Sequence, residues 1–289
     1  MCRHFSRRIN NMNLLDKIRK LIGSKICMAI CVVIAIVSLV VIINDDIQKK
    51  RAQEKVDKLA QEAVTEKGSG EEAEVYMNFE ALHEINSDIY AWIFVPNTNI
   101  NYPVLQSPQG KDTDYYLNTN LDGSSGYPGC IYTQLRNSKD FTDPVTIIYG
   151  HNMKNGTMFA NLHQYRDQEF FQQNPYVYIF GEKQNMAYKV FSCAVFDDKL
   201  ILDYYNDFEN EKDMSLFMEE VKNQSENYDD SIEINLNEDK IIGLSTCMAN
   251  SPNERLYVFA KKLTDDEVNK LNLHKQINEV IKYIGSHEN

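Results

Sequence analysis

Three side chains in this sequence have the types and the local settings that covalent catalysis needs. Cys247 ends an apolar run that begins at residue 241, and His151 directly follows a second apolar run at 145–150. Each run is typical of a buried strand that ends in a reactive side chain. Arg255 lies eight residues after Cys247. A thiol, an imidazole and a guanidinium are the groups needed for acyl transfer through a thioester.

Cys247 is the candidate nucleophile, because a thiolate attacks carbonyl carbon and a nearby cation favours this ionised form. A cysteine at a strand end is more often inert packing, but here the strand opens onto a polar loop at 248–254. His151 is the candidate both for the nearby cation, as an imidazolium, and for the proton carrier. It follows an apolar strand as Cys247 does, and the ends of two such strands can converge at one end of a barrel. Arg255 begins the next strand, from where it can donate hydrogen bonds to a developing oxyanion. The alternative for Arg255 is a surface charge at a strand end.

The elements that position these groups are predicted to be short strands. Aromatic and β-branched runs bounded by turn residues indicate strands. They lie at 90–95, 100–105, 129–133, 145–149, 176–180, 186–196, 240–246 and 255–262. Because regular helices do not separate them, the sequence predicts a mainly β fold, an eight-stranded β-barrel with a few helices, more than a parallel α/β sheet.

Three helices are predicted to interrupt or follow the strands. A short one lies at 79–85 and a longer one at 212–224. Apolar side chains recur at i, i+3, i+4 and i+7 in the longer helix, so one face should pack on the barrel. Thr264 with Glu267 forms a capping-box pattern that opens a C-terminal helix. Packing on the domain is the ordinary interpretation of this helix, and contact with a partner is the alternative.

The N-terminus has the features of a membrane anchor. Residues 1–25 hold seven basic side chains and one acid, and 26–43 is an uncharged apolar run of 18 residues. This length is close to what a helix needs to span hydrocarbon, and the basic flank predicts a cytoplasmic N-terminus. No small-x-small cleavage pattern follows, which favours an uncleaved anchor over a signal peptide. We therefore expect a single-pass protein of the plasma membrane with an extracellular catalytic domain.

The chain is accordingly expected to have five parts. They are a cytoplasmic basic tail at 1–25, a transmembrane anchor at 26–43, a stalk at 44–75, a catalytic barrel at 76–263 and a C-terminal helix at 264–289. The stalk is dominated by Lys, Glu, Gln and Ala and ends in Gly68-Ser69-Gly70, so it should be a helix followed by a flexible joint.

Composition limits the partners and cofactors. The net charge of −12 argues against nucleic acid and is ordinarily a matter of solubility. The six cysteines do not form a disulfide framework, because three of them fall in the tail and the apolar run. Cys130 and Cys193 lie in strand-like runs and are expected to be small core residues. No cysteine has metal-type spacing with a histidine, and four aspartates between 197 and 207 fit a solvated loop better than a Ca²⁺ site. We predict no metal and no cofactor.

With these motifs the sequence resembles a class B sortase. The residues that carry the resemblance are Tyr149-Gly150-His151-Asn152-Met153, Leu244-Ser245-Thr246-Cys247 and Arg255. It extends over roughly 77–263 and includes Trp92-Ile93, Ile100-Asn101-Tyr102-Pro103-Val104, Tyr116-Leu117-Asn118 and Thr157-Met158-Phe159. The long helix at 212–224 is also a trait of this class. One departure is Gly243, where the family usually has Thr at the head of a Thr-Leu-x-Thr-Cys signature; this position supports the strand and performs no chemistry.

The resemblance implies a membrane-anchored cysteine transpeptidase of the Gram-positive cell surface. Such an enzyme cuts a C-terminal sorting signal of a secreted protein after Thr, forms a thioacyl-enzyme, and transfers the protein to an amine. The amine belongs to a peptidoglycan precursor of the cell wall or to a pilin. In this resemblance Cys247 attacks the Thr carbonyl, His151 protonates the leaving amine and deprotonates the incoming one, and Arg255 holds the signal and stabilises the oxyanion.

The same resemblance implies that Leu117, Tyr149, Ser245 and Thr246 line the groove that binds the signal. Plain barrel packing explains Leu117 and Thr246 nearly as well.

Two other functions stay open from the residues. A different cysteine peptidase, such as a papain-like or cell-wall endopeptidase, usually places Cys before His and at the start of a helix, whereas here His151 precedes Cys247 and both follow strands. A membrane-tethered barrel that binds a partner without catalysis would leave Cys247 unreactive. Selective labelling of Cys247 over Cys130 and Cys193 by a thiol probe distinguishes this second alternative from an enzyme.

Overall fold

The computed structural model describes residues 2–67, 74–198, 201–205, 208 and 210–286, with side chains from residue 23 onward except that of Asp203. The chain divides into two units, Met1–Arg51 and Ala52–Asn289. The Gly68-Ser69-Gly70 joint expected from the sequence lies outside the described residues.

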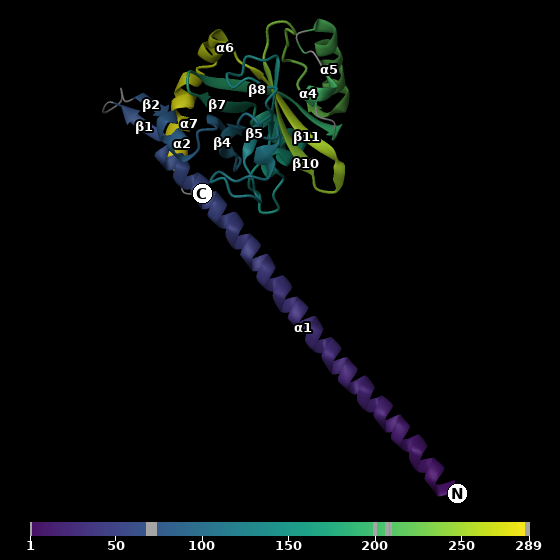
Figure 1. Cartoon of the computed structure of the whole chain (residues 1–289). Helices are drawn as coiled ribbons and strands as arrows, with labels where there is room; N and C mark the ends of the chain where they lie inside the picture. Colours follow the sequence, from purple (N-terminus) through teal and green to yellow (C-terminus); the bar gives the residue numbers. More distant parts are fainter. Residues whose placement is uncertain (1, 68–73, 199–200, 206–207, 209, 287–289) are drawn as a thin grey trace. The chain divides into compact units, whose positions relative to one another are not determined.

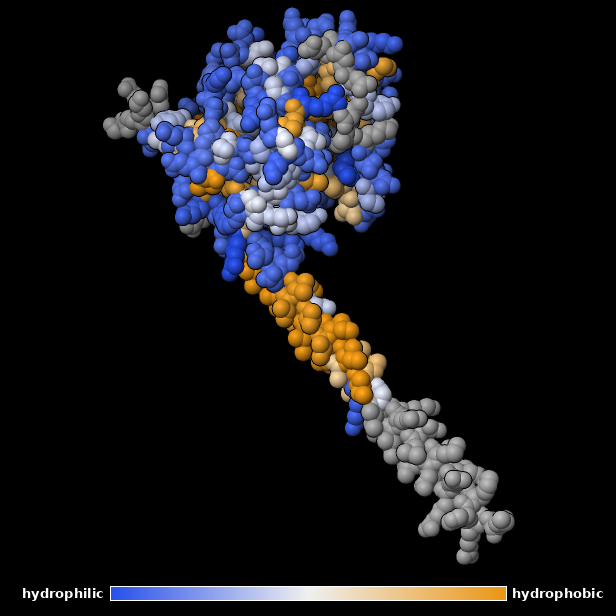
Figure 2. Space-filling model, in the orientation of Figure 1, coloured by the Kyte–Doolittle hydropathy of each residue, from blue (hydrophilic) through white to orange (hydrophobic). Residues whose placement is uncertain are grey.

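The first unit is helical. It belongs to α1, which runs over Cys2–Glu62. Within the described residues, one helical stretch, Gly23–Glu62, is long and apolar enough to cross a membrane, and it contains the expected anchor at 26–43. The isoleucine and valine side chains of the run at 26–43 are 49–61% exposed, for example Ile34 at 59% and Val41 at 61%. Figure 2 shows this continuous apolar surface along the helix, which is what contact with lipid requires.

The second unit is built on a closed β-barrel. In the described residues eight strands form the ring in the order β11-β10-β6-β5-β4-β3-β7-β8, and β8 pairs with β11 to close it. Their bounds are β3 Ile89–Phe94, β4 Asn101–Gln106, β5 Ile131–Thr133, β6 Val145–Tyr149, β7 Tyr176–Gly181, β8 Asn185–Asp197, β10 Ile241–Met248 and β11 Ser251–Lys262. The predicted eight-stranded barrel is confirmed, and each strand overlaps the run from which it was expected. A short β9, Ser225–Tyr228, adds to β8 outside the ring.

Helices and turns cover the barrel. They are α2 Phe79–Ile85, η2 Tyr115–Leu117, η3 Ala160–Arg166, α3 Gln168–Gln173, α4 Ile201–Tyr204, α5 Glu211–Gln224, α6 Asp265–Lys270 and α7 Leu273–Ser286. Figure 1 shows the barrel strands with α5 and α7 on different sides of them. The helix predicted at 212–224 is α5, and its apolar face is buried at Met214, Phe217 and Val221. Thr264 and Glu267 form the predicted capping box at the start of α6.

The predicted C-terminal helix is divided into α6 and α7 by a break at 271–272, and both parts pack on the domain, as its ordinary interpretation predicts. Ile277, Ile281 and Ile284 of α7 are buried in one cluster with Leu59 and other apolar side chains from the end of α1. There, two short strands, β1 Val64–Lys67 and β2 Glu74–Met77, pair antiparallel and contact α7. The segment expected as a stalk at 44–75 therefore contributes to the hydrophobic core from Leu59 onward.

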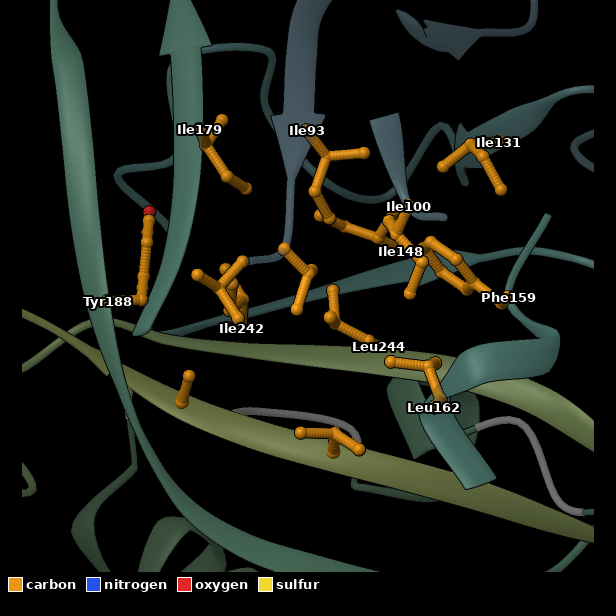
Figure 3. Close-up of a cluster of buried hydrophobic side chains, with 14 of the residues drawn as sticks. Ile93, Ile100, Ile131, Ile148, Phe159, Leu162, Ile179, Tyr188, Ile242 and Leu244 are labelled. Carbon is orange, nitrogen blue, oxygen red and sulfur yellow. The ribbon is translucent and has the colours of Figure 1, made fainter. Parts of the chain in front are cut away.

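The barrel interior is filled by branched aliphatic side chains from all sides. Figure 3 shows Ile242 and Leu244 of β10 pointing toward Ile148 of β6 and Ile93 of β3, with Phe159 and Leu162 closing one end. On the outer side of the same strands, Ile147 and Phe259 belong to a separate cluster with α4 and α5. Since successive side chains alternate between faces, this division fixes which residues of β10 point inward.

Gly243, the one departure from the sortase signature, has a packing reason. It lies on the outer face of β10, directly between its register partners Ile147 on β6 and Phe259 on β11. A Cβ at this position would lie 2.7 Å from Ile147 Cδ1 and 2.8 Å from Phe259 Cε1. The side chains of Ile147 and Phe259 occupy the space that a Cβ needs, so a larger residue at position 243 would have to displace them.

We predict that Gly243→Ala lowers the free energy of unfolding by about 1–3 kcal/mol, the usual cost of overpacking a core. Gly181→Ala is the matched control, because its Cβ meets atoms at 3.4 Å or more. Thermal unfolding can be followed by the fluorescence of Trp92, the single tryptophan of the chain, which is fully buried. Equal unfolding midpoints in the two variants would contradict this account of Gly243.

Candidate active site

The strand order brings the three candidate residues to one end of the barrel. β10 lies between β6, to which it is parallel, and β11, to which it is antiparallel. Tyr149 is in register with Ser245, so the chain leaves β6 at His151 beside the point where β10 reaches Cys247. Arg255 is the register partner of Cys247 on β11. Residues far apart in sequence, as His151 and Cys247 are, meet here because parallel strands end at the same edge.

Cys247 lies on the outer face of the barrel. Ile242 and Leu244 point inward, so Thr246 points inward as well, while Ser245 and Cys247 point outward. Cys247 is partly exposed, whereas Cys130 and Cys193 are buried. Burial raises the pKa of the Cys193 thiol to about 12 and raises that of Cys130. Among the three thiols of the second unit, Cys247 is the one that solvent and substrate can reach.

His151 is held by its neighbours in one orientation. Its Nε2 lies 2.8 Å from the carbonyl oxygen of Leu117, and its backbone carbonyl accepts a hydrogen bond from the Phe159 amide at 3.0 Å. The ring of Tyr127 lies against the imidazole, with 4.8 Å between centroids. A carbonyl oxygen only accepts, so Nε2 carries the proton and Nδ1 is the basic nitrogen of the neutral ring.

The electrostatic setting of His151 favours the neutral imidazole. Burial lowers its pKa below the ordinary 6.5, and the hydrogen bond to Leu117 opposes this shift. At neutral pH the ring is therefore ready to accept a proton. The sequence suggested an imidazolium that would assist ionisation of the thiol; the burial of this ring favours a neutral base instead.

Arg255 shares the outer face with Cys247, but its side chain is engaged with the hairpin. Its Nη1 donates to the carbonyl oxygens of Pro252 at 3.0 Å and Glu254 at 3.1 Å. The guanidinium charge still acts on this face, since it lowers the pKa of Tyr132 and of Tyr257 against the larger effect of their burial, which raises both. Those hydrogen bonds fix the guanidinium beside the β10–β11 turn.

The four residues expected to line a groove differ in position. Ser245 lies on the outer face and is hydrogen-bonded to Tyr257, and Tyr149 stacks on Tyr132 with 5.4 Å between ring centroids. Leu117 contributes its carbonyl to His151 and is partly exposed. Thr246 instead faces the barrel interior; it and Ser245 are both 2% exposed, so the two differ in the face of the strand and not in exposure.

The position of Thr246 follows from the two-residue period of the strand. Its hydroxyl donates to the carbonyl of Gly150 at 2.8 Å. This bond ties β10 to the residue before His151, so Thr246 holds the two strand ends together from inside and does not line the outer face.

Two residues at this site were not identified from the sequence. Asn152 Nδ2 donates to the carbonyl oxygen of Cys247 at 2.9 Å, and His163 Nε2 lies 3.1 Å from the same oxygen. Burial lowers the pKa of His163, and its contact with the Cys247 carbonyl opposes the shift. Asn152 follows His151 directly, a placement that was visible in the motif. His163 lies in η3, and no sequence pattern connects it to Cys247.

The described side chains were also compared with the ligand sets that metal ions need. Over the part of the chain that the structure describes, no group of three or more His, Cys, Asp or Glu side chains is placed to hold a metal ion. Of the four aspartates between 197 and 207, the side chains of Asp203 and Asp207 lie outside the described part.

Comparison with known proteins agrees with the geometry. The model of the sortase domain family matches residues 93–263, more than half of the chain. This chain belongs to the sortase family. Sortases are cysteine transpeptidases in general, and the match includes the strands that carry His151, Cys247 and Arg255.

The relatives are class B sortases. Sortase B of Listeria monocytogenes is 37% identical over 170 residues, which cover 57% of this chain and 65% of that protein. Sortase B of Staphylococcus aureus is 31% identical over 236 residues, 80% of this chain and 92% of that protein. A solved complex of the S. aureus sortase B with a substrate superposes with a TM-score of 0.57 at 33% identity, over 65% of this chain and 85% of that one. The chain thus spans just under two thirds of the first relative and most of the second.

Proposed function

We propose that this sortase cleaves the C-terminal sorting signal of secreted proteins after Thr and transfers the new carboxyl end to an amine of the cell wall or of a pilin. The observation that carries the proposal is the convergence of Cys247 and His151 at one end of parallel strands, with the thiol on the accessible outer face. A solved relative, the sortase B of S. aureus in complex with a substrate, supports a substrate-binding role for this site.

In the first step Cys247 Sγ bonds to the Thr carbonyl carbon while Nδ1 of His151 takes the thiol proton. The tetrahedral intermediate collapses, the scissile C–N bond breaks, and the same proton passes to the leaving amine. In the second step the incoming amine attacks the thioester carbon and gives its proton to Nδ1. The C–S bond then breaks and Cys247 recovers a proton. The fixed Nε2–H bond to Leu117 keeps Nδ1 available in both steps.

Arg255 is proposed to hold the signal and to donate to the oxyanion. Its Nη1 is committed to the hairpin carbonyls, so Nη2 and Nε are the donors proposed to serve substrate. Because Arg255 is the register partner of Cys247, its side chain leaves the same face at the same level. Ser245, Tyr149 and the Leu117 side chain are proposed as the surrounding groove.

The anchor is proposed to hold the enzyme at the outer surface of the plasma membrane. The apolar helix of the first unit meets the length and composition that a span requires, and the basic residues before it favour a cytoplasmic N-terminus. The enzyme, its anchored substrates and a lipid-linked acceptor would then be confined to the same membrane surface. This confinement raises their effective concentration.

The proposal is tested by incubating the full chain with peptides of the Pro-x-Thr-Gly and Asn-Pro-x-Thr-Asn types, with and without a primary amine. The expected products are cleavage after Thr and, when amine is present, an amide of the Thr carboxyl, both identified by mass. Cleavage at another bond, or products that form equally well without Cys247, would reject the mechanism. A chain that labels at Cys247 but cleaves none of the peptides would favour another peptide substrate class.

The Leu117 carbonyl that orients His151 depends on Gly129. Gly129 has φ +67°, and a Cβ there would lie 2.7 Å from the Tyr116 carbonyl oxygen and closer still to that of Leu117. We predict that Gly129→Ala lowers the transfer rate by about 10- to 100-fold, because the Leu117 carbonyl must move and the imidazole with it.

Gly123→Ala is the matched control for Gly129→Ala. It lies in the same loop with φ +78° but has no atom within 4 Å of its Cβ, so it adds the backbone strain without the displacement. Transfer rates of the two variants, measured with the same peptide, separate the effects. Equal rates would show that Gly129 acts through strain alone.

A further inference from the structure

The carbonyl of Cys247 points to the edge of β10 that faces β6. Carbonyls of residues two apart on a strand point to the same edge, and the Ser245 carbonyl accepts a hydrogen bond from the Gly150 amide at 3.0 Å. The parallel register of β6 with β10 ends at Tyr149 and Ser245. The Cys247 carbonyl therefore lies beyond this ladder, where the chain turns away at His151. On its other side the register with β11 shifts directly after Cys247.

Two side chains contact the Cys247 carbonyl where a neighbouring strand would otherwise supply its hydrogen-bond donor. Asn152 Nδ2 lies 2.9 Å from the Cys247 oxygen and His163 Nε2 lies 3.1 Å from it, while the two nitrogens are 3.0 Å apart. A carbonyl oxygen only accepts, so both nitrogens bond to it as donors and Nε2 of His163 carries its ring proton. The contact between the two nitrogens is then proximity and not a third hydrogen bond. Asn152 directly follows His151 in the main chain.

The loop that carries Asn152 is a rigid support. Asn152 forms a β-bridge with Met158, and the Phe159 amide donates to the His151 carbonyl at 3.0 Å. Met158 is 4% exposed and Phe159 is fully buried, so the far side of this hairpin is anchored in the barrel interior. A displacement of the Asn152 amide would therefore move Cys247 relative to His151.

We propose that Asn152 and His163 are positioning residues, which set the placement of the Cys247 thiol against the His151 imidazole by holding the Cys247 carbonyl. The proposal rests on the proposed function, in which thiol and imidazole exchange a proton. Proton transfer is sensitive to a displacement of about 1 Å. The expected loss therefore falls on the turnover step, while substrate binding on the outer face is largely retained.

A matched control, Asn227, lies on β9 and contacts the end of η3. Asn227 Nδ2 donates to the carbonyls of Tyr165 at 2.8 Å and Arg166 at 3.0 Å. Asn227 is partly buried, as Asn152 is. It thus resembles Asn152 in chemistry and burial, but the carbonyls that it holds belong to η3 and not to Cys247.

The first test compares Asn152→Leu with Asn227→Leu in the full chain, using the peptide and amine that the wild type accepts. We expect Asn152→Leu to lower kcat by about 10- to 100-fold with KM within about threefold, and Asn227→Leu to keep kcat within about threefold of wild type. Equal losses in the two variants, or a loss confined to KM, would overturn the proposal.

The second test uses His163 and serves also if Asn152→Leu does not fold. In His163→Gln the amide nitrogen can occupy the place of Nε2, whereas His163→Leu has no polar atom there. We expect His163→Gln to keep kcat within about threefold and His163→Leu to lose about tenfold or more. Equal kcat in the two variants would overturn the assignment of His163.

Alkylation of Cys247 separates this proposal from the proposed function. If the wild type transfers no peptide, the proposed function fails. The rate at which iodoacetamide labels Cys247 then tests whether Asn152 positions the thiol. A rate that changes in Asn152→Leu but not in Asn227→Leu would support the proposal without any turnover. Unchanged rates in both variants would overturn it.

Discussion

Replacing Cys247 by alanine is expected to lower kcat/KM for peptide transfer by at least about 10⁴-fold, the scale of losses seen when an enzyme's nucleophile is removed. The physical reason is that Cys247 is the one thiol of the second unit on the accessible face of the barrel. Without its sulfur no thioester forms, and neither His151 nor Arg255 can supply a nucleophile. The measurement is the rate of product formation with and without amine.

Cys193→Ala is the control for this variant. Cys193 is fully buried in the barrel interior, and burial raises the pKa of its thiol to about 12. Its loss leaves a small cavity but no missing chemistry, so transfer should stay within about threefold of the wild-type rate. A probe that labels Cys247 in the wild type should leave Cys193 unlabelled, as peptide mapping would show. Activity that survives in Cys247→Ala would contradict the proposed thioester, because another group would then have to be the nucleophile.

The strands that carry the site could be predicted because their sequence signals are local. β6 and β10 are apolar on both faces, since one face lines the barrel interior and the other is covered by α4 and α5. Such continuous runs are evident in a sequence. β9, Ser225–Tyr228, was missed because its residues are mostly polar and it forms only by pairing with β8. β1 and β2 were missed as well, because each has only four residues and includes charged side chains.

The start of the core was missed although its signal was present. Val56, Leu59, Ala60 and Ala63 follow the spacing of one helix face, and the last three are buried against α7. The abundance of Lys and Glu around them suggested a solvated stalk. Only the structure shows that this helix face is covered, because its partner, α7, begins more than 200 residues later in the chain.

In the candidate site, too, some residues could be predicted from the sequence and others could not. His151, Cys247 and Arg255 were recognised as candidates because each carries a reactive group beside an apolar run. Arg255 was expected to begin its strand, but β11 starts earlier, at Ser251. For Thr246 the sequence left groove lining and barrel packing open, because it did not show which face of β10 is interior; the inward direction of its side chain agrees with packing. Asn152 and His163 contact a backbone carbonyl, and a carbonyl gives no signal in a sequence.

The second large effect is expected for His151→Gln, which should lower kcat/KM by about 10²- to 10⁴-fold, the contribution of a general acid–base residue. Glutamine can still donate to the Leu117 carbonyl from the place of Nε2, so the loop should keep its conformation. It has no basic nitrogen in place of Nδ1, so it cannot carry the thiol proton to the leaving amine.

The pH profile gives this variant a second readout. Burial disfavours the charged form of His151 and lowers its pKa below 6.5, so the neutral, active ring persists as pH falls until this lower pKa is reached. The acid limb of kcat/KM should therefore lie below pH 6.5 in the wild type and be absent in His151→Gln. His83→Gln is the control, because His83 pairs with Glu182 and the Ile89 carbonyl on another part of the barrel. An acid limb that survives in His151→Gln would assign the titration to another group, and His151 would then not be the proton carrier.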